Sequence, residues 1–501
     1  MKNSSRGLAL AIALCFSAGF APADENSVNP KILEILDKIS EARIRAILEK
    51  LEAFGTRNTM STQDDPVRGV GAARTWILNE FKSYNPRLQV RFEKFRVKKQ
   101  GQRIFKDVDL WNVIAVLPGT RMPETQIFVS GHYDSLNLGN RPAGAPAGPS
   151  ADGTGGGLNA TANMTLADFE KNADLPAPGV CDDGSGTAAV MELARVMSAY
   201  EFDKTLVFVA FAGEEQGLIG SGLQAAKSRK ENQVIEAVLN NDIIGTEVAG
   251  NGRTGNSSLN IYSDETMDSV SQQLSRYVRE IGERYLPAMK VNTIFMGDRL
   301  GRGGDHTPFQ LEGFAAVRFS TPNEIYVNQH HAGDTLANMS VPYTTRVAKV
   351  NAAVAASLAL APKPPIVMPE PRAASAAAAG ATASAAASPV TTPAGTTSGS
   401  APGRRIGPMI SRGGGYDAVL RWRVAGSDAD IKGYAIMIRP TTSPYWEQEI
   451  YVGKVNTYTM KDVSIDDLKF GVRAIGANGA ESLVTPYAYP PRQKTEILTV
   501  E

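Results

Sequence analysis

The feature that most constrains the fold is an apolar run, residues 206–213, followed directly by two carboxylates, Glu214 and Glu215. A run this rich in Val, Phe and Ala is typical of a central strand in a sheet that helices cover on both faces. Such sheets bind ligands at the carboxyl ends of their strands. Two buried acids are costly there unless a metal ion compensates one, which leaves the other free as a general base. The sequence therefore predicts a metal site at this edge.

Other polar residues also follow apolar runs or precede helical patterns. They are His132 and Asp134 after residues 126–130, Asp242 after 234–240, His330 and His331 after 315–319, and Asp182 and Asp183 before a helical pattern at 187–200. Three of the four histidines of the chain fall in these motifs. Histidine and carboxylate without thiolate favour catalytic zinc, with cobalt or manganese as alternatives.

The order of the patterns predicts the fold class. Strand patterns alternate with helix patterns between about residues 30 and 361. This alternation is typical of an α/β domain in which a parallel or mixed sheet lies between two layers of helices.

These motifs, in this order, resemble those of the M28 family of two-zinc aminopeptidases, and in particular its exported bacterial members. The resemblance implies a three-layer α/β/α zinc-peptidase fold with a mixed central sheet. It also implies a ligand set: Asp182 bridging two zinc ions, His132 and Asp242 on one ion, and Glu215 and His330 on the other. Glu214 would be the general acid/base. Asp134 and Asp334 would support the ligands from outside, as such carboxylates generally do.

At two places the family motif could match either of two neighbouring residues, and at one position the chain departs from the family pattern. Asp182 is preferred to Asp183 because it stands three residues before Ser185, and His330 is preferred to His331 because Asp334 follows it at the family spacing. The family often carries a Tyr directly before this His, where it stabilises the oxyanion. This chain has Gln329 at that position. Tyr326 could supply the phenol instead, although an ordinary loop aromatic is an equal reading.

The resemblance implies a metal-dependent exopeptidase that hydrolyses the amino-terminal peptide bond of peptides with a free amino terminus. Water activated by two zinc ions would attack, with Glu214 transferring the proton. A glutaminyl cyclase, a single-zinc acyltransferase on the same fold, is the alternative, and a peptide-binding pseudoenzyme is a third possibility. No ligand of the set has been lost, which disfavours the pseudoenzyme.

The amino terminus predicts export. Lys2 and Arg6 precede an apolar stretch at 7–20 that ends in small residues, so residues 1–23 form a signal peptide. About 14 apolar residues are short of the ~20 that span a bilayer, so no stable membrane anchor is expected after cleavage. The mature protein would be periplasmic or secreted. Equal numbers of acidic and basic residues, 52 each, give no global charge to attract nucleic acid.

The carboxyl-terminal part divides into two segments. Residues 362–403 are rich in Ala, Pro, Ser and Thr and predict a linker, so truncation near residue 365 is expected to leave a folded catalytic domain of residues 24–361. Residues 404–501 carry short alternating runs that predict an all-β sandwich, with Trp422, Tyr434 and Phe470 in its core. The segment resembles a fibronectin type III module, which would bind a surface or the catalytic domain.

Overall fold

The structure is a computed structural model that describes residues 28–139, 164–368, 411–412 and 417–488. The predicted signal peptide lies outside these ranges. Within them, no helix has both the length and the apolar character needed to cross a membrane.

The centre of the amino-terminal domain is an eight-stranded sheet in the order β1-β2-β4-β3-β5-β8-β6-β7. The strands are β1 (Gln89–Val97), β2 (Val108–Leu117), β3 (Met122–His132), β4 (Lys204–Phe211), β5 (Val234–Asn241), β6 (Ser258–Tyr262), β7 (Lys290–Ile294) and β8 (Ala316–Ser320). Strands β4, β3, β5 and β8 are parallel, and antiparallel pairs flank them. Their carboxyl ends therefore meet at one edge, and the expected mixed sheet is confirmed.

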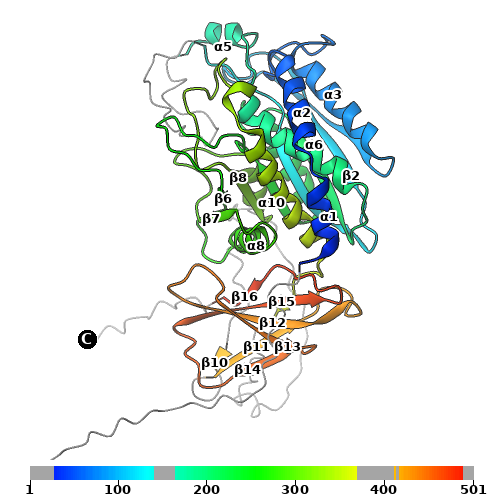
Figure 1. The fold of residues 1–501 in the computed structure, drawn as a ribbon, viewed down its shortest axis with the longest axis vertical. Helices are drawn as coiled ribbons and strands as arrows, with labels where there is room; N and C mark the ends of the chain where they lie inside the picture. Colours follow the sequence, from blue (N-terminus) through cyan, green and yellow to red (C-terminus); the bar gives the residue numbers. More distant parts are fainter. Residues whose placement is uncertain (1–27, 140–163, 369–410, 413–416, 489–501) are drawn as a thin grey trace, which may run out of the picture.

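Helices cover both faces of this sheet, and Figure 1 labels those of one layer. One layer contains α1 (Pro30–Lys38), α2 (Glu41–Ala53), α3 (Gly69–Tyr84), α6 (Ser185–Met197), α8 (Val270–Tyr285) and α10 (Val341–Leu360). The other layer contains α7 (Ile219–Lys230) and α9 (His306–Leu311). Residues alternate between the two cores along β4, with Leu206 and Phe208 on one side and Val207 and Val209 on the other. The expected three-layer α/β/α architecture is confirmed.

The carboxyl-terminal part forms two antiparallel sheets. One contains β9 (Ile366–Val367), β10 (Ser411–Arg412), β11 (Ala418–Arg423) and β14 (Thr457–Met460), and the other contains β12 (Ile431–Pro440), β13 (Gln448–Gly453), β15 (Leu468–Gly476) and β16 (Thr485–Pro486). Trp422, Tyr434 and Phe470 are buried in their shared core, as expected. Strand β9 lies inside the segment predicted as linker and pairs with β11.

The carboxyl-terminal sheets lie directly against α8 (Figure 1). Arg473 Nη2 contacts Glu280 Oε2 at 2.6 Å, and Arg439 Nη2 contacts Asp268 Oδ1 at 2.7 Å. Both arginine side chains are almost fully buried in these contacts. Charged groups from both parts thus neutralise each other at the interface.

The same interface also contains an uncharged hydrogen bond and an apolar contact. The Tyr277 hydroxyl of α8 donates to the backbone oxygen of Glu481 at 3.0 Å. Leu483 belongs to the same hydrophobic core as the helices on one face of the central sheet. The expectation of two modules joined only by a flexible linker takes no account of these contacts.

Candidate metal centre

The predicted ligands gather at one edge of the central sheet. His132 is the last residue of β3 and is paired in register with Phe211, the last residue of β4. Glu214 and Glu215 follow β4 within four residues, and Asp242 follows β5 directly. Parallel strands end at the same edge, so their following residues converge there.

Six buried side chains form two groups in which the possible ligand atoms lie within 4.8 Å of one another. The first group is His132, Glu214 and Asp242, and the second is Asp182, Glu215 and His330. The five residues predicted as ligands are all present, and Glu214 joins the first group. A proton-transferring carboxylate must also lie close to the metal centre, so this position suits the predicted role of Glu214.

Asp182 belongs to the second group and also faces the first. Its Oδ1 is 3.3 Å from His132 Nε2, and its Oδ2 is 3.3 Å from His330 Nε2. His330 Nε2 is also 3.0 Å from Glu215 Oε2. One carboxylate oxygen therefore faces each group, as a carboxylate that bridges two cations must.

The donor set fits zinc. Imidazole nitrogen and carboxylate oxygen are ligands that zinc takes in catalytic sites. Two of these atoms, His132 Nε2 and Glu215 Oε1, are buried without a hydrogen-bond partner among the described residues. Buried polar atoms are normally paired, so the two atoms indicate a missing partner such as a cation.

The electrostatics of the site also favour a cation. Burial lowers the pKa of the His330 imidazole, but Glu215 and Asp182 outweigh burial and raise this pKa to about 9. Burial and nearby carboxylates, above all Glu215, raise the pKa of Glu214 well above its usual range. His330 and Glu214 therefore bind protons more tightly than usual, because other carboxylates surround them. Metal cations would compete with these protons for the same nitrogen and oxygen atoms.

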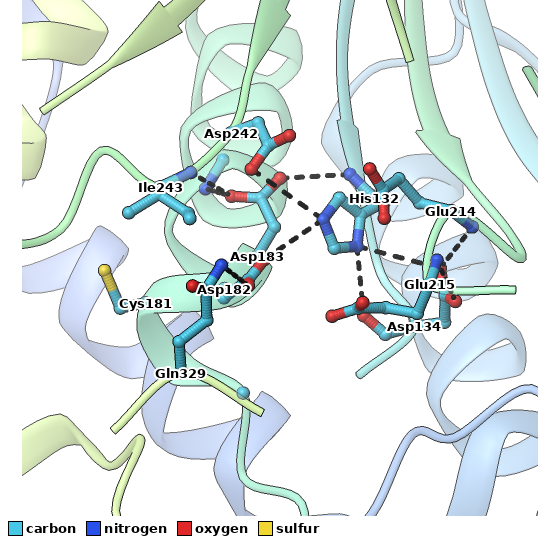
Figure 2. A network of polar contacts seen from close by, with 12 residues as sticks. His132, Asp134, Cys181, Asp182, Asp183, Glu214, Glu215, Asp242, Ile243 and Gln329 are labelled. Carbon is cyan, nitrogen blue, oxygen red and sulfur yellow. Dashed lines mark hydrogen bonds and ion pairs between the residues drawn. The ribbon is translucent and has the colours of Figure 1, made fainter. Parts of the chain in front are cut away.

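Asp183 has a different task from Asp182. Both lie in η1 (Val180–Gly184), just before α6, but the carboxylate of Asp183 is directed at backbone N–H groups, among them those of His132 and Ile243 (Figure 2). Its Oδ2 accepts the backbone N–H of His132 at 3.1 Å, and its Oδ1 accepts that of Gly186 at 2.8 Å. The carboxylate of Asp183 therefore fixes the loop, and the carboxylate of Asp182 is the one that faces the ligands.

Asp134 supports the site through backbone contacts. Its carboxylate accepts the N–H groups of Glu214 at 3.1 Å and Glu215 at 3.2 Å. His132 Nδ1 lies 3.1 Å from the Asp134 backbone oxygen and 3.7 Å from its carboxylate. The backbone oxygen of Asp134 thus orients the imidazole, whereas its carboxylate positions the turn that carries the two glutamates.

Asp334 supports the second group, because its carboxylate accepts the backbone N–H groups of Cys181 and Asp182, both at 2.9 Å.

Of the neighbouring histidines, His330 is buried in the second group and His331 is exposed. Tyr326 is 48% exposed, and its hydroxyl makes no hydrogen bond within the described part of the chain. The structure thus leaves Tyr326 outside the group of converging side chains.

The sequence analysis missed Arg318. This residue of β8 is fully buried, and its Nη2 donates to Asp242 Oδ1 at 2.9 Å while its Nη1 donates to Asp298 Oδ2 at 2.5 Å. The signal for it was an arginine inside an otherwise apolar strand, Ala316–Ser320. A charge in such a strand needs a partner, and here the partner is a predicted ligand.

Comparison with known sequences identifies relatives along almost the whole chain. A family model, "Peptidase family M28", matches residues 112–355. A "Probable zinc metalloprotease" of Pyricularia oryzae is 35% identical over 486 residues, covering 90% of this chain and 83% of the relative. A protein of the same description from Pyrenophora tritici-repentis is 31% identical over 492 residues, covering 91% and 97%. Both relatives are fungal, which corrects the expected bacterial kinship.

Two solved structures illustrate the range of similar folds. The LapA aminopeptidase of Legionella pneumophila is 19% identical, with a TM-score of 0.48 over 67% of this chain and 76% of its own. The glutaminyl cyclase of Porphyromonas gingivalis is 16% identical, with a TM-score of 0.43 over 63% and 98%. Likeness at this level does not distinguish the two activities.

Proposed function

Since this chain belongs to the M28 family of zinc metalloproteases, we propose that it is an aminopeptidase that removes the amino-terminal residue of peptides. The observation that carries the proposal is the position of Asp182, with one carboxylate oxygen 3.3 Å from a histidine of each group. This arrangement supports a pair of zinc ions and disfavours a single one. His132 and Asp242 would hold one ion, Glu215 and His330 the other, and Asp182 both.

Bound zinc would supply Lewis-acid polarisation of the peptide carbonyl and of the attacking water. The protein's own contribution is proton transfer. Burial, together with neighbouring carboxylates, raises the pKa of Glu214. Glu214 lies beside the predicted ligands, so it would take the proton of the attacking water and return it to the leaving amine.

The charge of the site supports a substrate with a free amino terminus. Carboxylates predominate among the converging side chains. The amino-terminal amine of a peptide would interact favourably with them, either as a protonated cation or as a ligand of the metal that they hold. A blocked amino terminus would lose this interaction. Acetylation of the substrate should therefore reduce kcat/KM by at least ~100-fold.

The test is hydrolysis of a leucyl peptide and its acetylated form by the zinc-loaded protein, together with the zinc content. Two zinc ions per chain and strong preference for the free amine are expected. Equal rates would point to an endopeptidase. One zinc ion with cyclisation of amino-terminal glutamine would instead identify a glutaminyl cyclase.

Export is part of the proposal. The signal peptide predicted at residues 1–23 would direct the protein to the periplasm or out of the cell, where peptides are its substrates. The carboxyl-terminal sheets, which resemble a fibronectin type III module in sequence, would serve to stabilise the catalytic domain through α8. The contacts of Arg473 and Arg439 with α8 and its flank support this role.

A further inference from the structure

Arg57, on the loop after α2, is a fully buried arginine whose guanidinium donates to backbone oxygens. Its Nε donates to the oxygen of Tyr133 at 2.6 Å, and its Nη2 donates to that of Gly179 at 2.7 Å. Its Nη1 donates to the oxygens of Leu51 at 3.1 Å and Pro178 at 2.5 Å. No carboxylate of the described residues lies within 4.0 Å of this guanidinium. Its direct contacts therefore fix the main chain.

The two segments that the guanidinium joins carry ligands of different metal groups. Tyr133 follows His132 of the first group directly, and Gly179 stands three residues before Asp182 of the second group. The side chains of His132 and Asp182 then approach to 3.3 Å. A guanidinium is planar and rigid, so its donors hold their acceptors at a set separation. Arg57 thus ties the segment of one group to the segment of the other.

The main chain of Arg57 joins the same segments. Its N–H group donates to Ser135 Oγ at 3.0 Å, and its backbone oxygen accepts the N–H group of Ser135 at 3.3 Å. The Ser135 hydroxyl donates in turn to the backbone oxygen of Ala177 at 2.7 Å. The loop after α2, the segment after β3 and the segment before η1 are therefore one hydrogen-bonded unit.

Gly179 allows Arg57 to approach the ligand segment closely. Its φ of 51° lies in the left-handed region, which favours glycine. A Cβ at this position would lie 3.0 Å from Arg57 Nη2, 2.8 Å from the backbone oxygen of Asp182 and 2.5 Å from Ser135 Cβ. Any side chain here would push the guanidinium and the Asp182 segment apart.

The charge of Arg57 interacts with the carboxylates around the site. Burial lowers the pKa of its guanidinium to about 10, while Asp334, Asp134, Asp183 and Asp182 act in the opposite direction. Arg57 therefore stays charged at neutral pH. Buried carboxylates need compensating charge, and Arg57 contributes part of it without occupying a ligand oxygen.

We propose that Arg57 is a positioning residue, which holds the segments of His132 and Asp182 at the separation that metal binding requires. The proposal rests on the metal centre of the proposed function. Arg57 would act through the main chain of Tyr133 and Gly179 and not through a ligand side chain. Metal sites tolerate only small changes in ligand distance, so the loss of Arg57 should reduce zinc affinity.

The first test is a zinc titration against a competing chelator. Arg57→Met, which has no N–H group in its side chain, should bind zinc ~10–100-fold more weakly, the usual effect of removing a group that supports the ligands. Arg57→Lys keeps the charge but lacks the planar fork, so it should recover only part of the affinity. The matched control is Arg87→Met, because Arg87 also donates to backbone oxygens, those of Ser198 and Tyr200 beyond α6. The control should bind zinc as the wild type does.

A second test disturbs the same contact and leaves Arg57 in place. Gly179→Ala adds a methyl group beside Nη2 and should also weaken zinc binding at least ~10-fold. Gly101→Ala is the matched control, since Gly101 has a φ of 61° and nothing within 4 Å of an added Cβ. Both changes strain the backbone, but only Gly179→Ala displaces the guanidinium.

A third measurement reports metal spacing without turnover. Cobalt(II) takes imidazole and carboxylate ligands and is paramagnetic, and two such ions bridged by a carboxylate are magnetically coupled. Electron paramagnetic resonance of the cobalt-loaded protein should show weaker coupling in Arg57→Lys and in Gly179→Ala than in the wild type. Near-ultraviolet circular dichroism should show that both variants are folded.

Unchanged zinc affinity and unchanged cobalt coupling in folded Arg57→Lys and Gly179→Ala would overturn the positioning role, even if Arg57→Met fails to fold. Equal losses in Arg87→Met or Gly101→Ala would overturn it too, because the effect would then be general. A wild type that binds one zinc ion per chain would instead overturn the proposed function. Zinc titrations of the Arg57 variants would then still decide whether Arg57 positions the ligands of that ion.

Discussion

Arg318 Nη2 and Asp242 Oδ1 form an ion pair 2.9 Å apart, and the two side chains are 0% and 3% exposed. Asp298 shares the same guanidinium, so the charge of Arg318 is divided between a predicted metal ligand and a residue behind it. Such a pair holds the ligand carboxylate in one orientation before any metal arrives. Removal of one partner leaves the other charge buried and uncompensated.

Replacement of Arg318 by Met should therefore destabilise the protein by ~3–5 kcal/mol and weaken zinc binding. Denaturant unfolding and a zinc titration measure the two effects. Arg346→Met is the matched control, because Arg346 pairs with Glu247 at 3.6 Å and both side chains are about one-third exposed. The control should cost at most ~1 kcal/mol. Equal effects of both changes would refute a special role for Arg318.

Glu214→Gln should lower kcat by ~10²–10⁴-fold and leave the zinc content unchanged, because it removes proton transfer and keeps the shape of the side chain. Steady-state kinetics and elemental analysis check this. Asp182→Ala is the contrasting variant and should lose zinc, since its carboxylate faces both groups. Loss of zinc in Glu214→Gln would show that Glu214 is a ligand of the first group and not the proton acceptor.

The interface with α8 should weaken in acid. Burial opposes ionisation of Glu280, but Arg473 outweighs burial and lowers the pKa of this carboxyl below its usual 4.5. A lowered folded-state pKa gives stability that is complete above pH 4.5 and is lost as the pH falls through the folded-state value. Acid unfolding of the wild type and Glu280→Gln should diverge above this pH, with the variant less stable. Parallel curves would exclude Glu280 as the source.

Truncation near residue 365 should lower the melting temperature by roughly 5–10 °C, on the scale of 2–4 °C per kcal/mol for domains of this size. The reason is that Glu280 loses Arg473, Tyr277 loses its hydrogen bond to Glu481, and the core loses Leu483. Calorimetry of the truncated and full chains compares them. An unchanged melting temperature would restore the picture of independent modules joined by a linker.

The convergence of the ligand side chains could be predicted from sequence because it depends on local signals. Apolar runs mark buried strands, parallel strands end at one edge, and the residues after them must meet there. The ion pair of Arg318 with Asp242 could not be predicted in this way, because it depends on the register of β8 against β5. The guanidinium of Arg57 likewise contacts Tyr133 and Gly179, which lie 76 and 122 residues further along the chain.

The contacts at α8 escaped prediction for a different reason. Arg473 and Glu280 are separated by 193 residues, and each alone looks like an ordinary surface charge. The composition of residues 362–403 predicts a linker, but it carries no information on how the flanking domains pack.

The presence of Leu483 in the core of the catalytic domain has a consequence for biosynthesis. The ribosome adds Leu483 after every residue of the central sheet and of α8, so this part of the core is complete only once residue 483 has emerged. Domains generally fold as units during synthesis once their residues are available. The catalytic domain can fold before residue 483 emerges, as expected of the truncated chain, but it gains the last part of its stability only when Leu483 packs against it.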